Sequence, residues 1–321
     1  MAEDSSQNDR QWSGRTGGGN FGQRFLFAFL KKVKVKWLYP VLYPVVPFYC
    51  IVNHEAFGNI VWYFRNIHGF SRWKSFWMAL HNHFVFGKAV LDRFAILAGK
   101  GSQFRVEVEN REVFEQLLEQ PGGFIVAGSH VGNLELIGHF FNQNSKPLNV
   151  VIFGGEGKGL SEKRSQSFSK HNINDIPVSD NLDHIFQIKT ALDRGEVVVL
   201  ICDRIFGSSK TLEIDFFGRP AKFPLGSFLL AAQMQVPVVQ LSAAKKRHAL
   251  YLGYVNILPQ PDESMNLRAR SKFIAEQYAH TLEEVLRKHP EQWFNFFDFW
   301  GWREKKKVEE AQKFFSQNTI N

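Results

Sequence analysis

Short apolar runs alternate with amphipathic segments along most of this chain, and no other feature restricts its fold as strongly. Runs typical of strands occupy residues 104–108, 124–128, 148–153, 197–202, 236–241 and 250–257. Segments with the apolar spacing of helices occupy residues 111–119, 134–141, 182–194, 225–235 and 267–288. Strands that alternate with helices pair mainly in parallel, and the helices cover the sheet. The chain is therefore expected to be an α/β protein, with a single αβα domain around a mostly parallel central sheet.

The segments around this core divide the chain into four regions. Residues 1–20 are polar, rich in Gly and Ser, and lack the apolar stretch of a secretory signal, so we expect them to be disordered. Residues 21–101 have a helical, aromatic-rich pattern, and residues 102–303 hold the α/β core. Residues 304–321 are charged and are expected to form a solvated tail.

Residues 37–52 carry the strongest membrane signal. They are mostly apolar, follow a lysine-rich stretch, and include Pro40, Pro44 and Pro47. The run is shorter than the about 20 residues that span a bilayer, and prolines break a regular helix. We therefore interpret region 21–101 as membrane-associating through an interfacial anchor, with a spanning segment as the less favoured alternative.

Composition narrows the class of partner. The formal net charge is +8, which favours an anionic partner such as lipid headgroups, CoA phosphates or an acidic carrier protein. The 32 Phe and 8 Trp exceed the needs of a core and favour a membrane or lipid ligand. No nucleic acid is expected, because no RNA-binding signature accompanies the charge. The basic run at residues 245–248 is interpreted as a solvated turn between two strands.

Two cysteines, Cys50 and Cys202, lie in apolar runs and are expected to be buried in a protein of a reducing compartment. No spacing of Cys and His typical of a metal site is present, so no metal is expected.

His130 is the foremost catalytic candidate. It follows the strand at 124–128, and Glu135 lies five positions later at the start of a predicted helix. An imidazole titrates near neutrality, and a carboxylate can fix its tautomer, so the pair suits a general-base dyad. Asn133 can cap the helix or bind substrate, and helix N-terminal amides can stabilise an oxyanion. The alternative is structural: a backbone-bonded histidine, and a glutamate that complements the helix dipole.

A second candidate lies at the end of the strand at 197–202, where Asp203 and Arg204 follow directly. Open α/β sheets bind their ligands at the carboxyl ends of strands, although a structural Asp–Arg ion pair is an equal alternative here. Further along, residues 215–226 require a shaped turn, and the aromatic surface of residues 289–300 requires a core or a lipid to cover it.

In this order and spacing, the motifs resemble the bacterial lipid A late acyltransferase family (lauroyl and myristoyl acyltransferases), within the lysophospholipid acyltransferase-like group. The resemblance covers roughly residues 70–302. It rests on His130-x4-Glu135, Asp203-Arg204, the Phe216-Phe217-Gly218 turn with Pro224-Leu225-Gly226, and the closing Pro290-Glu291-Gln292-Trp293. The branch that carries forms of Leu80-His81-Asn82-His83-Phe84 and Leu91-Asp92-Arg93 is the most similar.

The resemblance implies an enzyme that moves a fatty acyl group from an acyl thioester, acyl-ACP or acyl-CoA, to a hydroxyl or amine of a lipid or glycolipid acceptor. It assigns His130 as general base and Glu135 as its orienting partner, and Asp203 matches the second acidic position of the family. It also implies a location at the cytoplasmic face of the inner membrane, and no cofactor beyond the acyl co-substrate.

The chain departs from the pattern of the family at the residue expected to stabilise the oxyanion. Late acyltransferases carry an arginine soon after the strand that here is 148–153, where this chain has Gly154-Gly155-Glu156-Gly157. Arg164 and Arg204 are the two candidates for that role. Two alternative functions stay open: a thioester or lipid hydrolase, and a non-catalytic basic protein that binds membranes or nucleic acid.

Overall fold

The structure is a computed structural model that describes residues 30, 33–134, 136, 146–152, 172–178, 181–205, 210–305 and 308. Several sequence-based predictions fall outside these residues: the disorder of residues 1–20, most of the helix at 134–141 and most of the tail at 304–321. Two candidate site residues, Glu135 and Arg164, also lie outside the described residues.

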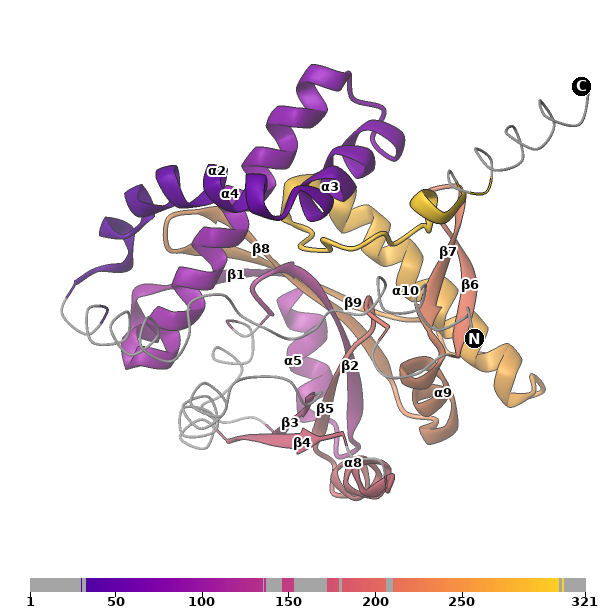
Figure 1. Ribbon diagram of the computed structural model, residues 1–321. Coiled ribbons are helices and arrows are strands. Elements are labelled where there is room, and N and C mark those ends of the chain that lie inside the picture. Colours follow the sequence, from indigo (N-terminus) through magenta and orange to yellow (C-terminus); the bar gives the residue numbers. More distant parts are fainter. Residues whose placement is uncertain are drawn as a thin grey trace, which may run out of the picture.

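A seven-stranded sheet in the order β1-β9-β8-β2-β5-β3-β4 forms the centre of the molecule (Figure 1). Its strands are β1 (Arg105–Glu109), β2 (Phe124–Gly132), β3 (Leu148–Ile152), β4 (Ile173–Pro177), β5 (Val197–Ile201), β8 (Val238–Arg247) and β9 (Leu250–Ile257). All neighbouring strands run parallel except β8 and β9, which form an antiparallel hairpin. The prediction of a mostly parallel sheet is confirmed.

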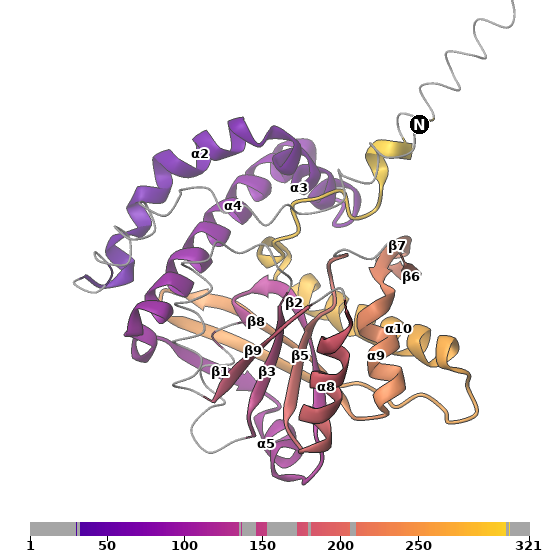
Figure 2. The ribbon, with the colours of Figure 1, turned by 60° about the horizontal axis from the view of Figure 1, so that its bottom comes forward.

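Helices cover both faces of the sheet because successive side chains of a strand point to opposite faces. Val126 of β2 shares a buried cluster with Phe114 of α5. Its neighbour Ile125 belongs to a second cluster, on the other face, which α8, α9 and α10 complete. Figure 2 shows α8 in front of the sheet. These helices are α5 (Arg111–Glu119), α8 (Asp183–Asp193), α9 (Leu225–Met234) and α10 (Leu267–Lys288).

The aromatic-rich region folds into helices that lie together on one side of the sheet (Figures 1 and 2). Asn82 of α4 joins them to the C-terminal segment, since its side-chain amide donates to the carbonyl oxygens of Glu291 and Trp293, 3.0 Å from each. The long helices are α2 (Leu42–Val52), α3 (His54–Asn66) and α4 (Arg72–Ala95). The short ones are η2 (Val35–Trp37), η3 (Tyr39–Val41), η4 (Ile96–Lys100) and η5 (Gly101–Gln103). The C-terminal segment begins with a further short helix, η6 (Pro290–Gln292).

The prolines of the apolar run interrupt it less than expected. Pro40 lies in η3, but α2 continues through both Pro44 and Pro47, so the expectation that prolines break the helix is wrong there. Pro44 occupies the first turn, where a backbone N–H has no helical partner to lose. By length and composition, Val35–Val52 is apolar enough to cross a membrane, with a mean hydropathy of 1.4, and 28% of it is buried in the protein.

Strand ends differ from the predicted ones where polar residues continue a strand. α5 and α10 have their predicted bounds, whereas β8 extends to Arg247, beyond its predicted end at residue 241. The predicted turn region is an antiparallel hairpin of β6 (Thr211–Phe216) and β7 (Arg219–Pro224). Its two turn residues, Phe217 and Gly218, have φ of 55° and 69°, as a tight hairpin turn requires.

A buried ionic cluster fastens α4 to the end of β8. The Lys245 ammonium pairs with the Asp92 carboxylate, and both side chains are almost fully buried. Tyr39 donates its hydroxyl to the same carboxylate over 2.6 Å, and Tyr251 also donates to it. Burial raises the pKa of Asp92 and lowers that of Lys245, because removing a charge from water disfavours its ionised form. The prediction of a solvated basic turn is therefore wrong for Lys245.

Replacing Lys245 by methionine leaves the Asp92 carboxylate buried without its cation, so we expect a loss of about 3–5 kcal/mol in the free energy of unfolding. The matched control is Lys246→Met, because Lys246 pairs with Glu107 at 3.3 Å on the surface, with both side chains at least half exposed. That variant should lose less than about 1 kcal/mol. Urea unfolding in detergent measures both, and equal losses would contradict a special role for the buried pair.

Candidate active site

A bulge at the end of β2 positions His130. Gly128 pairs with Leu241 of β8 and Gly132 pairs with Ala243, so three β2 residues oppose a single residue of β8 between those pairs. Extra residues bend a strand and redirect its side chains, and bulges are frequent beside functional sites. His130 lies within this bulge at the carboxyl end of the strand, with 27% of its side chain exposed.

Gly132 allows the strand to pass close to β8. Its φ is +61°, and a Cβ at this position would lie 1.8 Å from the carbonyl oxygen of Ala243. The next residue, Asn133, donates its backbone N–H to that same oxygen over 2.9 Å. The Asn133 side chain is buried and reaches the carbonyl of Ala89 on α4 at 3.4 Å. This candidate residue thus packs the end of β2 against α4.

Asp203 lies directly beside His130, because β5 is the neighbour of β2 and both residues follow the paired Gly128 and Ile201. The imidazole Nδ1 and an Asp203 carboxylate oxygen are 2.7 Å apart, and the backbone N–H of His130 donates to the other oxygen over 2.7 Å. Trp293 donates its indole N–H to Asp203 over 2.9 Å. The carboxylate is fully buried and accepts three hydrogen bonds.

The electrostatics favour a neutral imidazole beside an ionised carboxylate. Burial and the positive charge of Arg204 lower the pKa of His130 from its ordinary value of 6.5, although Asp203 opposes them. Burial alone raises the pKa of Asp203, but His130, Arg204 and the hydrogen bonds outweigh it and leave that pKa below its ordinary value. Because the carboxylate can only accept, the Nδ1 carries the proton, and the Nε2 lone pair has no partner among the described residues.

Two arginines approach this pair. Arg204 is buried and donates from Nη2 to the carbonyl oxygen of Phe294 over 2.6 Å. Burial lowers its pKa to about 10, so it stays cationic at neutral pH. Arg93 of α4 also lies close enough for its charge to lower the pKa of His130. A guanidinium in such a place can stabilise negative charge that develops beside the imidazole.

The closing aromatic segment completes the site. Val131 and Trp293 form an antiparallel bridge, and Phe294 donates its N–H to the carbonyl oxygen of His130 over 3.0 Å. Trp293 and Arg93 lie in motifs that carry the resemblance, but they are not among the predicted site residues. The sequence motifs could have marked both residues as candidates. The spacing along the chain, however, does not place either residue beside His130.

The fold and site together define a class: a three-layer α/β protein with a histidine–carboxylate pair at the carboxyl edge of its parallel strands. The family model of the bacterial lipid A biosynthesis acyltransferases matches residues 87–301, and the chain belongs to this family. A search of curated proteins finds no match to the chain. Family membership makes the protein an acyltransferase of lipid A biosynthesis, with a lipid acceptor and an acyl donor.

Proposed function

We propose that this acyltransferase moves a fatty acyl group from an acyl thioester, acyl-ACP or acyl-CoA, to a hydroxyl or amine of a lipid A-type acceptor, with His130 as general base. The observation that carries the proposal is the His130–Asp203 hydrogen bond of 2.7 Å. It supports an imidazole held in one tautomer, with the Nε2 lone pair available to a substrate.

In the proposed reaction, Nε2 of His130 takes the proton of the acceptor O–H or N–H as the acceptor atom attacks the thioester carbonyl carbon. The tetrahedral intermediate collapses with cleavage of the C–S bond, and the leaving thiolate takes the proton back from the imidazolium. Asp203 holds the imidazole and offsets its transient positive charge. No metal or organic cofactor takes part in these steps.

The proposed oxyanion donors are the cationic side chains near His130. Arg204 is one of them, and its hydrogen bond to the Phe294 carbonyl fixes the guanidinium. Arg93 supplies a second positive charge from α4. The role considered for Arg164 stays a prediction, as does that of Glu135.

Transfer is distinguished from hydrolysis by supplying a labelled acyl thioester with and without a lipid A precursor. We expect the label to move to the glycolipid, with little free fatty acid formed in the absence of acceptor. Equal release of free fatty acid in both reactions would instead favour a hydrolase. No consumption of thioester at all would favour a non-catalytic binding protein.

We further propose that the outer face of α2 lies in the cytoplasmic surface of the inner membrane. Leu42, Val46 and Cys50 form its buried face, while Tyr43, Phe48 and several other apolar side chains are exposed to the outside. An apolar helix face beside basic residues is typical of helices that lie in the headgroup region of anionic membranes. The cytoplasmic leaflet carries the negative surface potential that attracts such basic residues.

Flotation with anionic phospholipid vesicles tests this face. Phe48 and Ile51 are 69% and 75% exposed, so changing both to serine removes apolar area without disturbing the core. We expect vesicle binding to fall at least about tenfold, given about 1.5–3 kcal/mol for each large apolar side chain withdrawn from water. The control is Phe186→Ser on α8, where the side chain is 71% exposed. An equal effect of both changes would contradict the assignment.

A further inference from the structure

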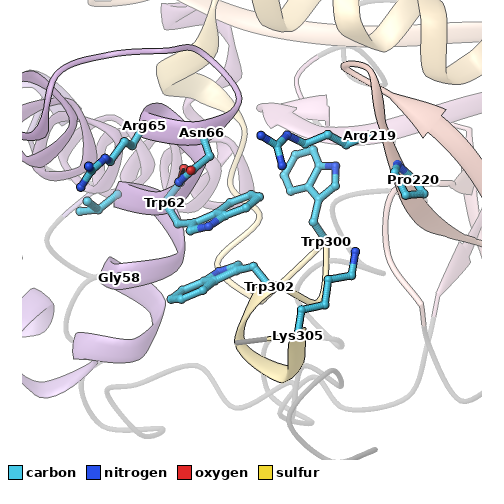
Figure 3. Close-up of a pocket in the computed structure, with 10 residues that line it drawn as sticks. Gly58, Trp62, Arg65, Asn66, Arg219, Pro220, Trp300, Trp302 and Lys305 are labelled. Atoms are coloured by element: carbon cyan, nitrogen blue, oxygen red, sulfur yellow. Dashed lines mark hydrogen bonds between the residues drawn. The ribbon is translucent and has the colours of Figure 1, made fainter. Parts of the chain in front are cut away.

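A pocket of about 610 Å³ lies outside the histidine site, between α3, the start of β7 and the C-terminal segment (Figure 3). None of His130, Asp203 and Arg204 lines it. Its walls combine large aromatic rings with positively charged side chains. The residues that carry the argument are Trp62, Arg65, Arg219, Trp300, Trp302 and Lys305.

Three indoles form the aromatic wall. Trp62 and Trp302 lie face to face, as Figure 3 shows. Their ring planes are 3° apart and their ring centroids 5.8 Å apart. Trp300 lies 5.7 Å from Trp62, tilted by 40°. Trp300 is only 7% exposed, yet its indole N–H has no hydrogen-bond partner among the described residues, nor does that of Trp302. Both nitrogen atoms are buried, so a ligand in the pocket would meet the ring carbons of the indoles rather than their N–H groups.

The charges of the pocket have one sign. Arg65, Arg219 and Lys305 line it. Within the described part of the chain, no acidic side chain lines it, and none of the three makes an ion pair. The Arg219 guanidinium lies 5.8 Å from the centroid of the Trp62 ring. Guanidinium and ammonium groups are the side chains that bind phosphate, and planar or apolar ring faces pack well on indoles.

We infer that this pocket binds a phosphate-bearing ring compound, with the ring against the indoles and the phosphate held by Arg219 and Lys305. Two sources offer that chemistry: the nucleotide end of a CoA thioester, and the phosphorylated sugar of a glycolipid acceptor. The choice between these sources rests on the proposed function, whereas binding itself does not.

The pocket is one aromatic layer away from the histidine site. Trp300 lies 5.8 Å from Trp293, ring centroid to ring centroid, and Trp293 donates to Asp203. A ligand held here is separated from His130 and Asp203 by the side chains of Trp293 and Trp300. Its phosphate contacts should therefore affect KM for the substrate that carries the phosphate more than kcat.

Calorimetry on the full-length protein in detergent tests the inference with three probes: adenosine 3′,5′-bisphosphate, glucosamine 1-phosphate and inorganic phosphate. The titrations are made on wild type and on His130→Ala, so that binding is measured whether or not His130 is the base. The informative variants are Arg219→Gln, Lys305→Gln and Trp62→Leu. The matched control is Lys272→Gln, since Lys272 is exposed on α10 and pairs with Glu276 at 3.6 Å.

We expect at least one ring-containing probe to bind saturably and more tightly than inorganic phosphate. Binding should weaken at least tenfold in each of the three pocket variants and stay unchanged in the control. Tighter binding of the nucleotide identifies the donor as its source, and tighter binding of the sugar phosphate identifies the acceptor. The inference is overturned if no probe binds saturably, if inorganic phosphate binds as tightly as the ring compounds, or if the pocket variants bind like the control.

Discussion

His130→Ala is expected to lower kcat for acyl transfer by about 10²–10⁴-fold, the usual contribution of a positioned general base. We expect kcat to fall while KM changes little. Alanine removes the proton acceptor but leaves the surrounding aromatic and cationic side chains in place. The measurement is the initial rate of label transfer from an acyl thioester to the lipid A precursor at saturating substrates.

The control for this variant is another histidine. His280 lies on the surface of α10, with its side chain 72% exposed, and pairs with Glu284 at 3.5 Å. His280→Ala should keep the wild-type rate, and both variants should melt within a few degrees of wild type. A His130→Ala protein with wild-type kcat would remove His130 from the mechanism.

Asp203→Asn is expected to be nearly as harmful, with kcat reduced about 10²–10⁴-fold, because the asparagine amide can present an N–H to Nδ1 and favour the wrong imidazole tautomer. It also removes a negative charge that raises the pKa of His130, so the acid limb of the rate profile should move to lower pH. Asn has the shape of Asp, and its remaining oxygen can still accept from Trp293, which keeps the variant folded.

Glu135→Gln tests which of the two carboxylates, Glu135 or Asp203, orients His130. The resemblance assigns Glu135 as the orienting partner, while Asp203 is the carboxylate that contacts the imidazole among the described residues. If Asp203 orients His130, the glutamine variant leaves the acid limb where it is. A larger kcat loss in Glu135→Gln, together with the shift of the acid limb, would instead give that role to Glu135.

Much of the fold could be predicted because its strands are apolar and its helices amphipathic, as the predicted bounds of α5 and α10 show. β4 was missed because its sequence, Ile-Asn-Asp-Ile-Pro, is half polar, as is common for an edge strand. β8 was predicted too short because Ser242 and Lys245 are polar yet buried, each with its own partner. Those partners come from distant segments, which no local pattern records.

The site was predictable in its parts but not in its arrangement. His130 and Asp203 were each recognised at the end of a strand, yet they are 73 positions apart in the chain. Their contact depends on β5 being the neighbour of β2, and strand order is a property of the whole sheet. A carboxylate five positions after His130 is visible in the sequence, whereas one on the adjacent strand becomes visible only in the fold.

The pH dependence of kcat/KM for transfer, measured side by side for wild type and His130→Ala, tests the role of His130 most directly. A general base works when neutral, so the rate falls as pH drops through its pKa, and burial with Arg204 lowers that pKa below 6.5. The wild-type profile should show an acid limb with its midpoint below 6.5, and the residual activity of the variant should lack it. The same acid limb in both proteins, at comparable rates, would contradict the assignment of His130 as the base.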